Sequence, residues 1–101
     1  MSIEFTADVT GREDCVVSVV DTLRTDRDLE MLGPLEHGIA RFRFVNCPAR
    51  DGWSEDLTLA LRPGKIVIAF HSASRENRER IIRLLEMVLR RSGCSGAFVE
   101  E

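Results

Sequence analysis

The sequence lacks any apolar run long enough to cross a membrane. Its longest strongly apolar stretch, residues 66–70, is far shorter than the roughly twenty residues that a membrane helix needs. The N-terminal segment also lacks a basic stretch followed by an apolar run, so no secretory signal is expected. The sequence therefore predicts a soluble, cytoplasmic protein.

Cysteine is scarce, and its spacing is not that of a metal site. Cys15, Cys47 and Cys94 are odd in number and far apart, whereas structural zinc sites use short paired spacings. A metal site from these cysteines with His37 and His71 would need scattered ligands to converge. We therefore expect no metal and no cofactor, and a reducing cytoplasm as the natural compartment.

Catalytic motifs are also missing from the sequence. It holds no glycine motif that cradles phosphate, which argues against a nucleotide enzyme. His37 and His71 are the residues best suited to acid or base chemistry near neutral pH, but neither has a carboxylate partner that the sequence places beside it. We predict that the chain is not an enzyme. An enzyme that uses one of these histidines is a third hypothesis, after the two binding hypotheses given below.

A length of 101 residues predicts one domain over 1–101. The charge is unevenly distributed along this domain. Residues 1–60 carry twelve acids and six bases, whereas residues 61–101 carry five acids and eight bases. Nucleic acids are bound largely through Lys and Arg. The acidic first part therefore favours a basic protein partner over nucleic acid.

Two helices are predicted from caps and helical spacing. Ser74 is a favoured N-cap, and Gly93 stands where a left-handed residue ends a helix. A first helix follows a capping box at residues 10–13. Its expected buried face consists of Val16, Val19, Val20 and Leu23.

Alternation of apolar and polar residues predicts the strands, at 2–9, 36–45, 55–61 and 65–71. Pro63 and Gly64 have the positions of a type II turn between the last two of these. The remaining segments are a second short turn or an irregular crossover at 29–34, a loop at 46–54, and either a short strand or a frayed tail at 95–99.

This order, β-α-β-β-β-α with a possible final β, predicts an α+β fold. It is a two-layer sandwich in which a mostly antiparallel sheet of four or five strands carries both helices on one face. The opposite face is expected to be polar, with Glu4, Thr6, Asp8, Arg41, Arg43, Thr58, Arg62 and His71.

Trp53 is the residue that most suggests a binding surface. It is the only tryptophan and lies among acids, Gly and Pro in the 46–54 loop. Large rigid side chains of this kind are frequent interface anchors, although the side chain would equally suit the end of the core. The candidate partner-binding residues are Trp53, Asp51, Glu55, Asp56, Asp26, Asp28, Glu30 and Glu36.

A helix, three antiparallel strands and a helix resemble the double-stranded RNA-binding domain. Such domains use a lysine-rich start of the second helix to contact phosphates. Here residues 74–80 alternate in sign and contain no lysine, so this RNA-binding module is the less favoured alternative.

The whole chain resembles, in type, the small immunity proteins of bacterial contact-dependent toxin systems. The strand pattern, the acidic clusters at 26–30 and 51–56, and Trp53 carry the resemblance. It implies a non-enzymatic protein that binds a cognate basic toxin of nuclease type and covers the toxin's active site with an acidic surface. The alternative is a small regulatory or oligomerisation domain that pairs through the polar sheet face or an edge strand, so monomer and homodimer both stay open.

Overall fold

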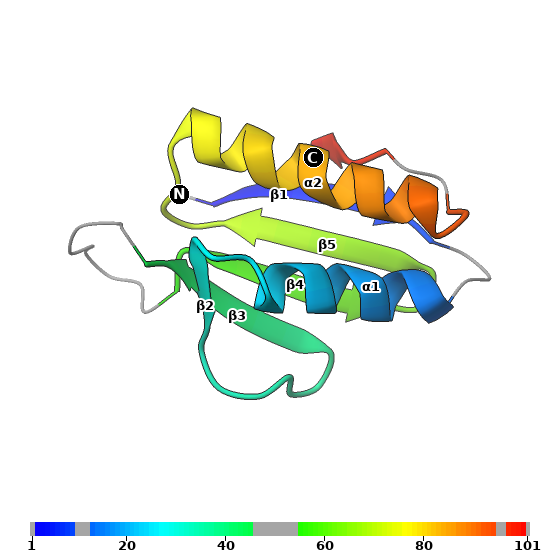
Figure 1. Cartoon of the computed structure of the whole chain (residues 1–101), viewed down its shortest axis with the longest axis horizontal. Helices are drawn as coiled ribbons and strands as arrows, with labels where there is room; N and C mark the ends of the chain where they lie inside the picture. The colour runs from blue at the N-terminus through cyan, green and yellow to red at the C-terminus, as the bar shows by residue number, and fades with distance from the viewer. Residues whose placement is uncertain (1, 10–12, 46–54, 95–96, 101) are drawn as a thin grey trace.

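A six-stranded antiparallel sheet with two helices on one face forms an α+β fold (Figure 1). The structure, a computed structural model, describes residues 2–9, 13–45, 55–94 and 97–100. The helices are α1 (Glu13–Arg24) and α2 (Arg75–Arg91). The strands are β1 (Ile3–Asp8), β2 (Leu29–Met31), β3 (Ile39–Phe44), β4 (Leu57–Arg62), β5 (Lys65–Phe70) and β6 (Val99–Glu100).

The strands are arranged in the order β2-β3-β4-β5-β1-β6, and every neighbouring pair is antiparallel. The nearly continuous apolar stretch of β5 lies between β4 and β1, as expected for a strand with neighbours on both sides. A short final strand exists, but it covers Val99–Glu100 and not 95–99: Val99 pairs with Thr6 and Glu100 with Phe5. The sheet thus has six strands instead of the expected four or five.

The additional strand is β2, which the sequence analysis interpreted as irregular. Residues 29–31 pair with 42–44 of β3, but three residues are too few to show alternation in the sequence. Four strands therefore separate α1 from α2. The helix, three strands, helix order of the RNA-binding domain is not the order of this chain.

A tight turn at His37 and Gly38 explains why β3 begins at Ile39 and not at Glu36. Both turn residues have positive φ, 52° and 75°, and Glu36 and Ile39 exchange two backbone hydrogen bonds of 3.1 and 2.8 Å. Paired positive φ values are typical of the two-residue turns that fit the twist of a hairpin. A side chain at Gly38 would also meet the carbonyl oxygen of Leu61, 2.9 Å from the added Cβ.

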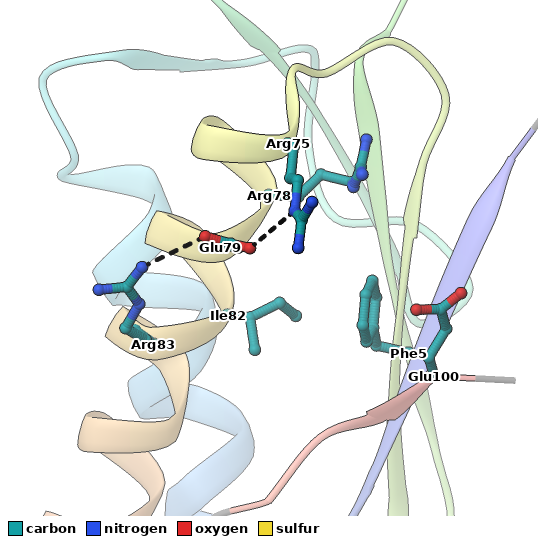
Figure 2. Close-up of a pocket in the computed structure, with 7 residues that line it drawn as sticks. All are labelled: Phe5, Arg75, Arg78, Glu79, Ile82, Arg83 and Glu100. Carbon is teal, nitrogen blue, oxygen red and sulfur yellow. Dashed lines mark hydrogen bonds and ion pairs between the residues drawn. The ribbon is translucent and has the colours of Figure 1, made fainter.

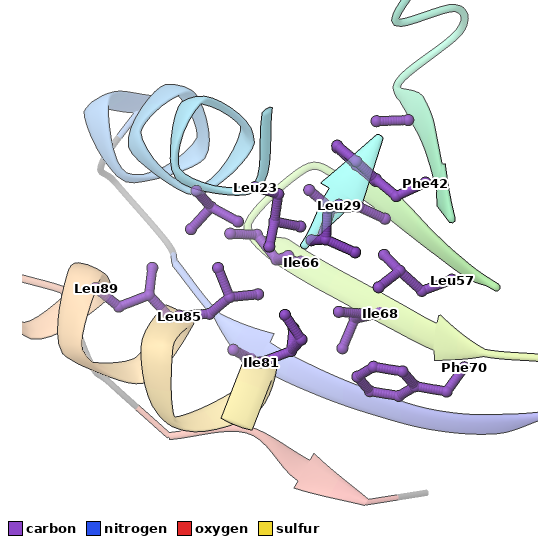
Figure 3. Close-up of a cluster of buried hydrophobic side chains, with 14 of the residues drawn as sticks. Leu23, Leu29, Phe42, Leu57, Ile66, Ile68, Phe70, Ile81, Leu85 and Leu89 are labelled. Atoms are coloured by element: carbon purple, nitrogen blue, oxygen red, sulfur yellow. The ribbon is translucent and has the colours of Figure 1, made fainter. Parts of the chain in front are cut away.

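The core lies between the sheet and the helices. Alternate residues of the strands face the helices, so that Phe42, Leu57 and Phe70 form one row across three strands. Figure 3 shows Leu23 of α1 and three residues of α2 pointing towards this face. The fully buried α2 residues are Ile81, Leu85 and Leu89.

The local signals around α2 are confirmed. The hydroxyl of Ser74 accepts a 3.1 Å hydrogen bond from the Asn77 N–H, and Gly93 has a φ of 81°. Gly64 has a φ of 73°, the positive value that a type II turn requires at its third residue. Residues 10–12 of the expected capping box lie outside the described residues.

Cys15 and Cys94 form a disulfide, with a Cα–Cα distance of 6.7 Å. A reducing cytoplasm, the compartment expected from the sequence, does not predict this bond, and Cys47 lies outside the described residues. Because 79 residues separate the two cysteines, their spacing in the sequence does not indicate that they pair. The bond joins the first turn of α1 to the turn after α2.

No helix in the described ranges is long and apolar enough to cross a membrane.

Candidate functional site

The predicted acidic surface does not form as expected. Asp56 is fully buried: its carboxylate accepts a 2.7 Å hydrogen bond from the Phe44 N–H. Its carbonyl oxygen accepts from the N–H groups of His71 and Ser72. The expectation that Asp56 contacts a partner is wrong, because its carboxylate is used to hold the ends of neighbouring strands together.

Asp26 and Asp28 lie close to a single arginine on α2. Arg80 Nη1 is 3.0 Å from Asp26 Oδ2, and Arg80 Nη2 is 3.5 Å from Asp28 Oδ2. Burial raises the pKa of Asp26, but hydrogen bonds from Arg80 and the Asp28 N–H, together with the Arg80 charge, outweigh it. The pKa of Asp26 therefore lies below its usual value of 3.8.

The other predicted acids are separated along the sheet. Glu30 lies 2.8 Å from Arg43 on the neighbouring strand, and Glu55 is partly buried one residue before Asp56. Glu36 is exposed at the turn before β3, at the opposite end of that strand from Arg43. Asp51 and Trp53 lie outside the described residues. Three of the described acids are thus compensated by arginine, which removes much of their attraction for a basic partner.

His71 is held between two hydroxyl groups. Its Nδ1 is 2.7 Å from Ser2 Oγ, and its Nε2 is 2.8 Å from Thr58 Oγ1. These contacts connect the start of β1, the end of β5 and β4. His37 is exposed in its turn. Among the residues that the structure describes, no group of three or more His, Cys, Asp and Glu side chains is placed to hold a metal ion.

A cleft of about 450 Å³ lies between α2 and the strands β1 and β6 (Figure 2). We call it the arginine cleft. Its lining residues are Phe5, Arg75, Arg78, Glu79, Ile82, Arg83 and Glu100. Three cations and two anions thus surround two apolar side chains.

The α2 wall of the arginine cleft is a row of alternating charges. Glu79 accepts from Arg75 at 3.1 Å and from Arg83 at 3.4 Å, one helical turn away on either side. Arg75 and Arg83 are mostly exposed, at 84% and 76%, so these two ion pairs exchange readily with another carboxylate. Arg78 is partly buried and donates to the carbonyl oxygen of Ala73 at 3.1 Å.

The floor of the cleft is apolar. Phe5 of β1 packs edge-on against Phe70, with ring centroids 6.0 Å apart, and Ile82 of α2 points towards it from the opposite side (Figure 2). Both side chains are only partly covered by the protein. A ligand in the cleft would therefore cover apolar surface as well as meet charge.

No family model, characterised protein or solved structure matches the chain. The side chains that line the cleft are therefore the evidence for what it binds. Arginine presents a planar fork of donors that matches a carboxylate in a bidentate manner. Concave sites of a few hundred cubic ångströms with an apolar lining and a few polar groups are typical of ligand pockets. The arginine cleft can thus hold a side chain or short segment with both a carboxylate and an apolar part.

The arginine cleft could not be predicted from the sequence, because its two walls are distant in the chain. Phe5 had the pattern of a core residue, and the α2 arginines had the pattern of a solvated helix face. The available signal was the helical spacing of Arg75, Arg78 and Ile82, which places two cations beside an apolar residue on one side of α2. Nothing local indicates that β1 and β6 would lie opposite them.

Proposed function

We propose that this chain is a non-enzymatic binding protein that recognises another protein through the arginine cleft. The observation that supports the proposal is the combination of three arginines with the apolar floor of Phe5 and Ile82. The partner contributes a segment in which Asp or Glu stands beside an apolar side chain. The carboxylate pairs with Arg78 and its neighbours while the apolar side chain packs on the floor.

The glutamates of the cleft favour a protein segment over nucleic acid. Glu79 and Glu100 lie among the arginines, and a phosphate backbone with one charge at every nucleotide would meet both of them. A single carboxylate can be placed at the arginines and avoid both glutamates. This arrangement selects for the position of a negative charge as well as for its sign.

The immunity hypothesis supplies a class for the partner, a cognate toxin. The original form of this hypothesis has the chain cover the toxin's basic active site with acids. In the structure, Asp26, Asp28 and Glu30 are paired with arginines, and Asp56 is buried. We therefore propose that binding of a toxin uses the arginine cleft and an acidic segment of the toxin. We keep the cytoplasm as the proposed location, and its reducing thiols would then act against the Cys15–Cys94 disulfide.

A peptide titration tests the proposal. The probe is a fluorescent peptide that alternates Asp with Leu, and its matched control carries Asn in place of Asp. The full-length chain is expected to bind the acidic peptide and not the Asn peptide, with an affinity that falls as salt is raised. Arg78→Glu should weaken binding by about tenfold or more, because it places like charges together.

Arg90→Glu is the matched control, since it makes the same charge change on α2 outside the cleft. It should leave the affinity unchanged. Equal loss in both variants would show a general effect of net charge and contradict a specific site. Preferential binding of duplex RNA, lost in Arg78→Glu, would overturn the proposal in favour of a nucleic-acid module.

A further inference from the structure

Strand β6 places a segment of this chain at the rim of the arginine cleft. Glu100 is paired with Phe5 of β1, so both side chains point to the helix side of the sheet, where both line the cleft. Figure 2 shows Glu100 beside Phe5, across the cleft from the arginines of α2. Alternation puts Phe98 on the same side as Glu100, and its side chain packs against the core. The segment thus has the pattern proposed for a partner, an apolar side chain and a carboxylate on one side.

Strand β6 itself is weakly held. It consists of two residues, and Val99 is 65% exposed. Glu100 forms no ion pair with another residue in the described part of the chain, the cleft arginines included. A strand that is this short and covers so little apolar surface requires little free energy to detach.

The chain just before β6 is held more firmly. The Phe98 N–H donates a 2.9 Å hydrogen bond to a carboxylate oxygen of Glu86 on α2. Cys94, a few residues earlier, is joined to α1 by the disulfide. Detachment can therefore be confined to Val99 and Glu100, while the rest of the fold stays in place.

Strand β1 offers more of its edge than β6 uses. The Val9 N–H donates to the carbonyl oxygen of Gly64 at 2.9 Å, in continuation of the β1–β5 register. The odd-numbered residues of β1 therefore bond to β5, and the backbone groups of Glu4, Thr6 and Asp8 face the β6 side. Among these three, only Thr6 is paired with a described residue of β6. A longer segment in the place of β6 would bond to more of this edge.

We propose that the partner of the arginine cleft binds as an extended strand that replaces β6 on β1. This inference rests on the proposed function and adds how the partner segment is held and what it displaces. An acid opposite Phe5 takes the place of Glu100 and pairs with Arg78 and its neighbours. The backbone of the segment bonds to the edge of β1, which is the strand-addition mode of peptide recognition. Strand β6 is then a competitor built into the chain, and a partner displaces it by supplying more backbone bonds.

A proline in β6 tests whether this strand competes with the partner. The probe is a fluorescent peptide with the repeat Leu-Thr-Asp-Thr, whose extended form has Leu and Asp on one side. Val99→Pro removes the N–H that faces Thr6 and changes no charge. It should lower the dissociation constant of the probe by about three- to tenfold, because β1 is then open in a larger fraction of the molecules.

Ala97→Pro is the matched control, because Ala97 is exposed and lies outside β6. It should bind the probe like the wild type. Unchanged circular dichroism melting shows that both proline variants fold.

NMR of the wild-type chain gives a second measurement that needs no variant. The free chain is expected to show nuclear Overhauser contacts between the backbones of Thr6 and Val99, which are paired in the sheet. Saturation with the probe should replace them with contacts between Thr6 and the peptide. A peptide that bound beside an intact β6 would leave the Thr6–Val99 contacts in place.

The outcomes separate this inference from the proposed function. A probe that binds the wild type, loses affinity in Arg78→Glu and leaves the Thr6–Val99 contacts in place would overturn strand replacement alone. So would a folded Val99→Pro that binds the probe no more tightly than Ala97→Pro does. If neither this probe nor the Asp–Leu peptide binds the wild type or Val99→Pro, the proposed function and this inference both fail.

Discussion

His37 shows how a single residue can limit stability. It occupies a left-handed conformation, with φ 52°, in which most residues with a side chain are disfavoured. Asn followed by Gly is the preferred pair for a turn of this kind. His37→Asn is therefore expected to raise the free energy of unfolding by about 0.5–1 kcal/mol.

Urea unfolding at neutral pH measures this change. His37→Val is the matched comparison, because a β-branched residue tolerates positive φ less well than histidine and should lower the stability. The reverse order of the two variants would show that the turn is not under strain at this position.

Residue-scale chemistry was the most predictable part of this protein. The structure confirms the predicted roles of three residues. The hydroxyl of Ser74 caps the free N–H groups of α2. Gly64 and Gly93 lack a Cβ and so adopt the positive φ that their turns require. Asp56 could not be predicted in the same way. An acid at the start of a strand is ordinarily exposed, and only the long-range pairing of β3 with β4 supplies the N–H that makes its burial possible.

At the scale of elements, Arg80 connects α2 to the segment between α1 and β2. Its guanidinium contacts Asp26, whose side chain is only 11% exposed, so the pair is less screened than the surface ion pairs. Arg80→Met is expected to lower the free energy of unfolding at pH 7 by about 1–2 kcal/mol. Arg83→Met, which removes an exposed pair on the same helix, should cost less than about 1 kcal/mol.

The loss in Arg80→Met depends on pH. Because the pKa of Asp26 is lowered in the folded state, its contribution is present above the pKa of the unfolded chain and is lost as the pH falls through the folded value. Denaturant unfolding should therefore show a clear difference from wild type at pH 7 and a shrinking difference below about pH 4. A difference that stays constant down to pH 2 would exclude this ion pair as its source.

Elements with six or more residues were predicted, and those with fewer were missed or left open. Strands β1, β3, β4 and β5 alternate over six residues each, which is enough to separate a period of two from a helical period. Strand β2 has three residues and β6 has two. Their formation depends on the neighbouring strand that each one meets, and that information is distant in the chain.

For the whole molecule, the Cys15–Cys94 disulfide closes most of the chain into one loop. Crosslinks over long loops stabilise chiefly by restricting the unfolded chain, and 79 residues separate these two cysteines. Reduction is expected to lower the free energy of unfolding by about 2–4 kcal/mol. Urea unfolding with and without a phosphine reductant measures the loss.

Two variants make this test specific. Cys47→Ala should retain the full response to the reductant, whereas the double change Cys15→Ala with Cys94→Ala should be destabilised and unresponsive. A wild-type chain that unfolds identically in both conditions would show that the bond contributes nothing to stability in solution.

The candidate site was the least predictable feature, for a reason that applies to the whole molecule. The arginine cleft needs Phe5, the first half of α2 and Glu100 together, and these are brought together only when the sheet is complete. The charge asymmetry of the sequence is real, but folding places Arg80 and Arg43 beside the acids and leaves other arginines at the cleft. Net charge along a chain therefore says little about the charge of one surface.

The position of β1 between β5 and β6 has a consequence for how the protein is made. Strand β1 leaves the ribosome before both of its hydrogen-bonding neighbours, which lie in the second part of the chain. It cannot enter the sheet until residues 65–70 have been synthesised, so its apolar side chains lack their final neighbours until then. The nascent chain thus offers a binding segment to chaperones that the finished protein no longer has.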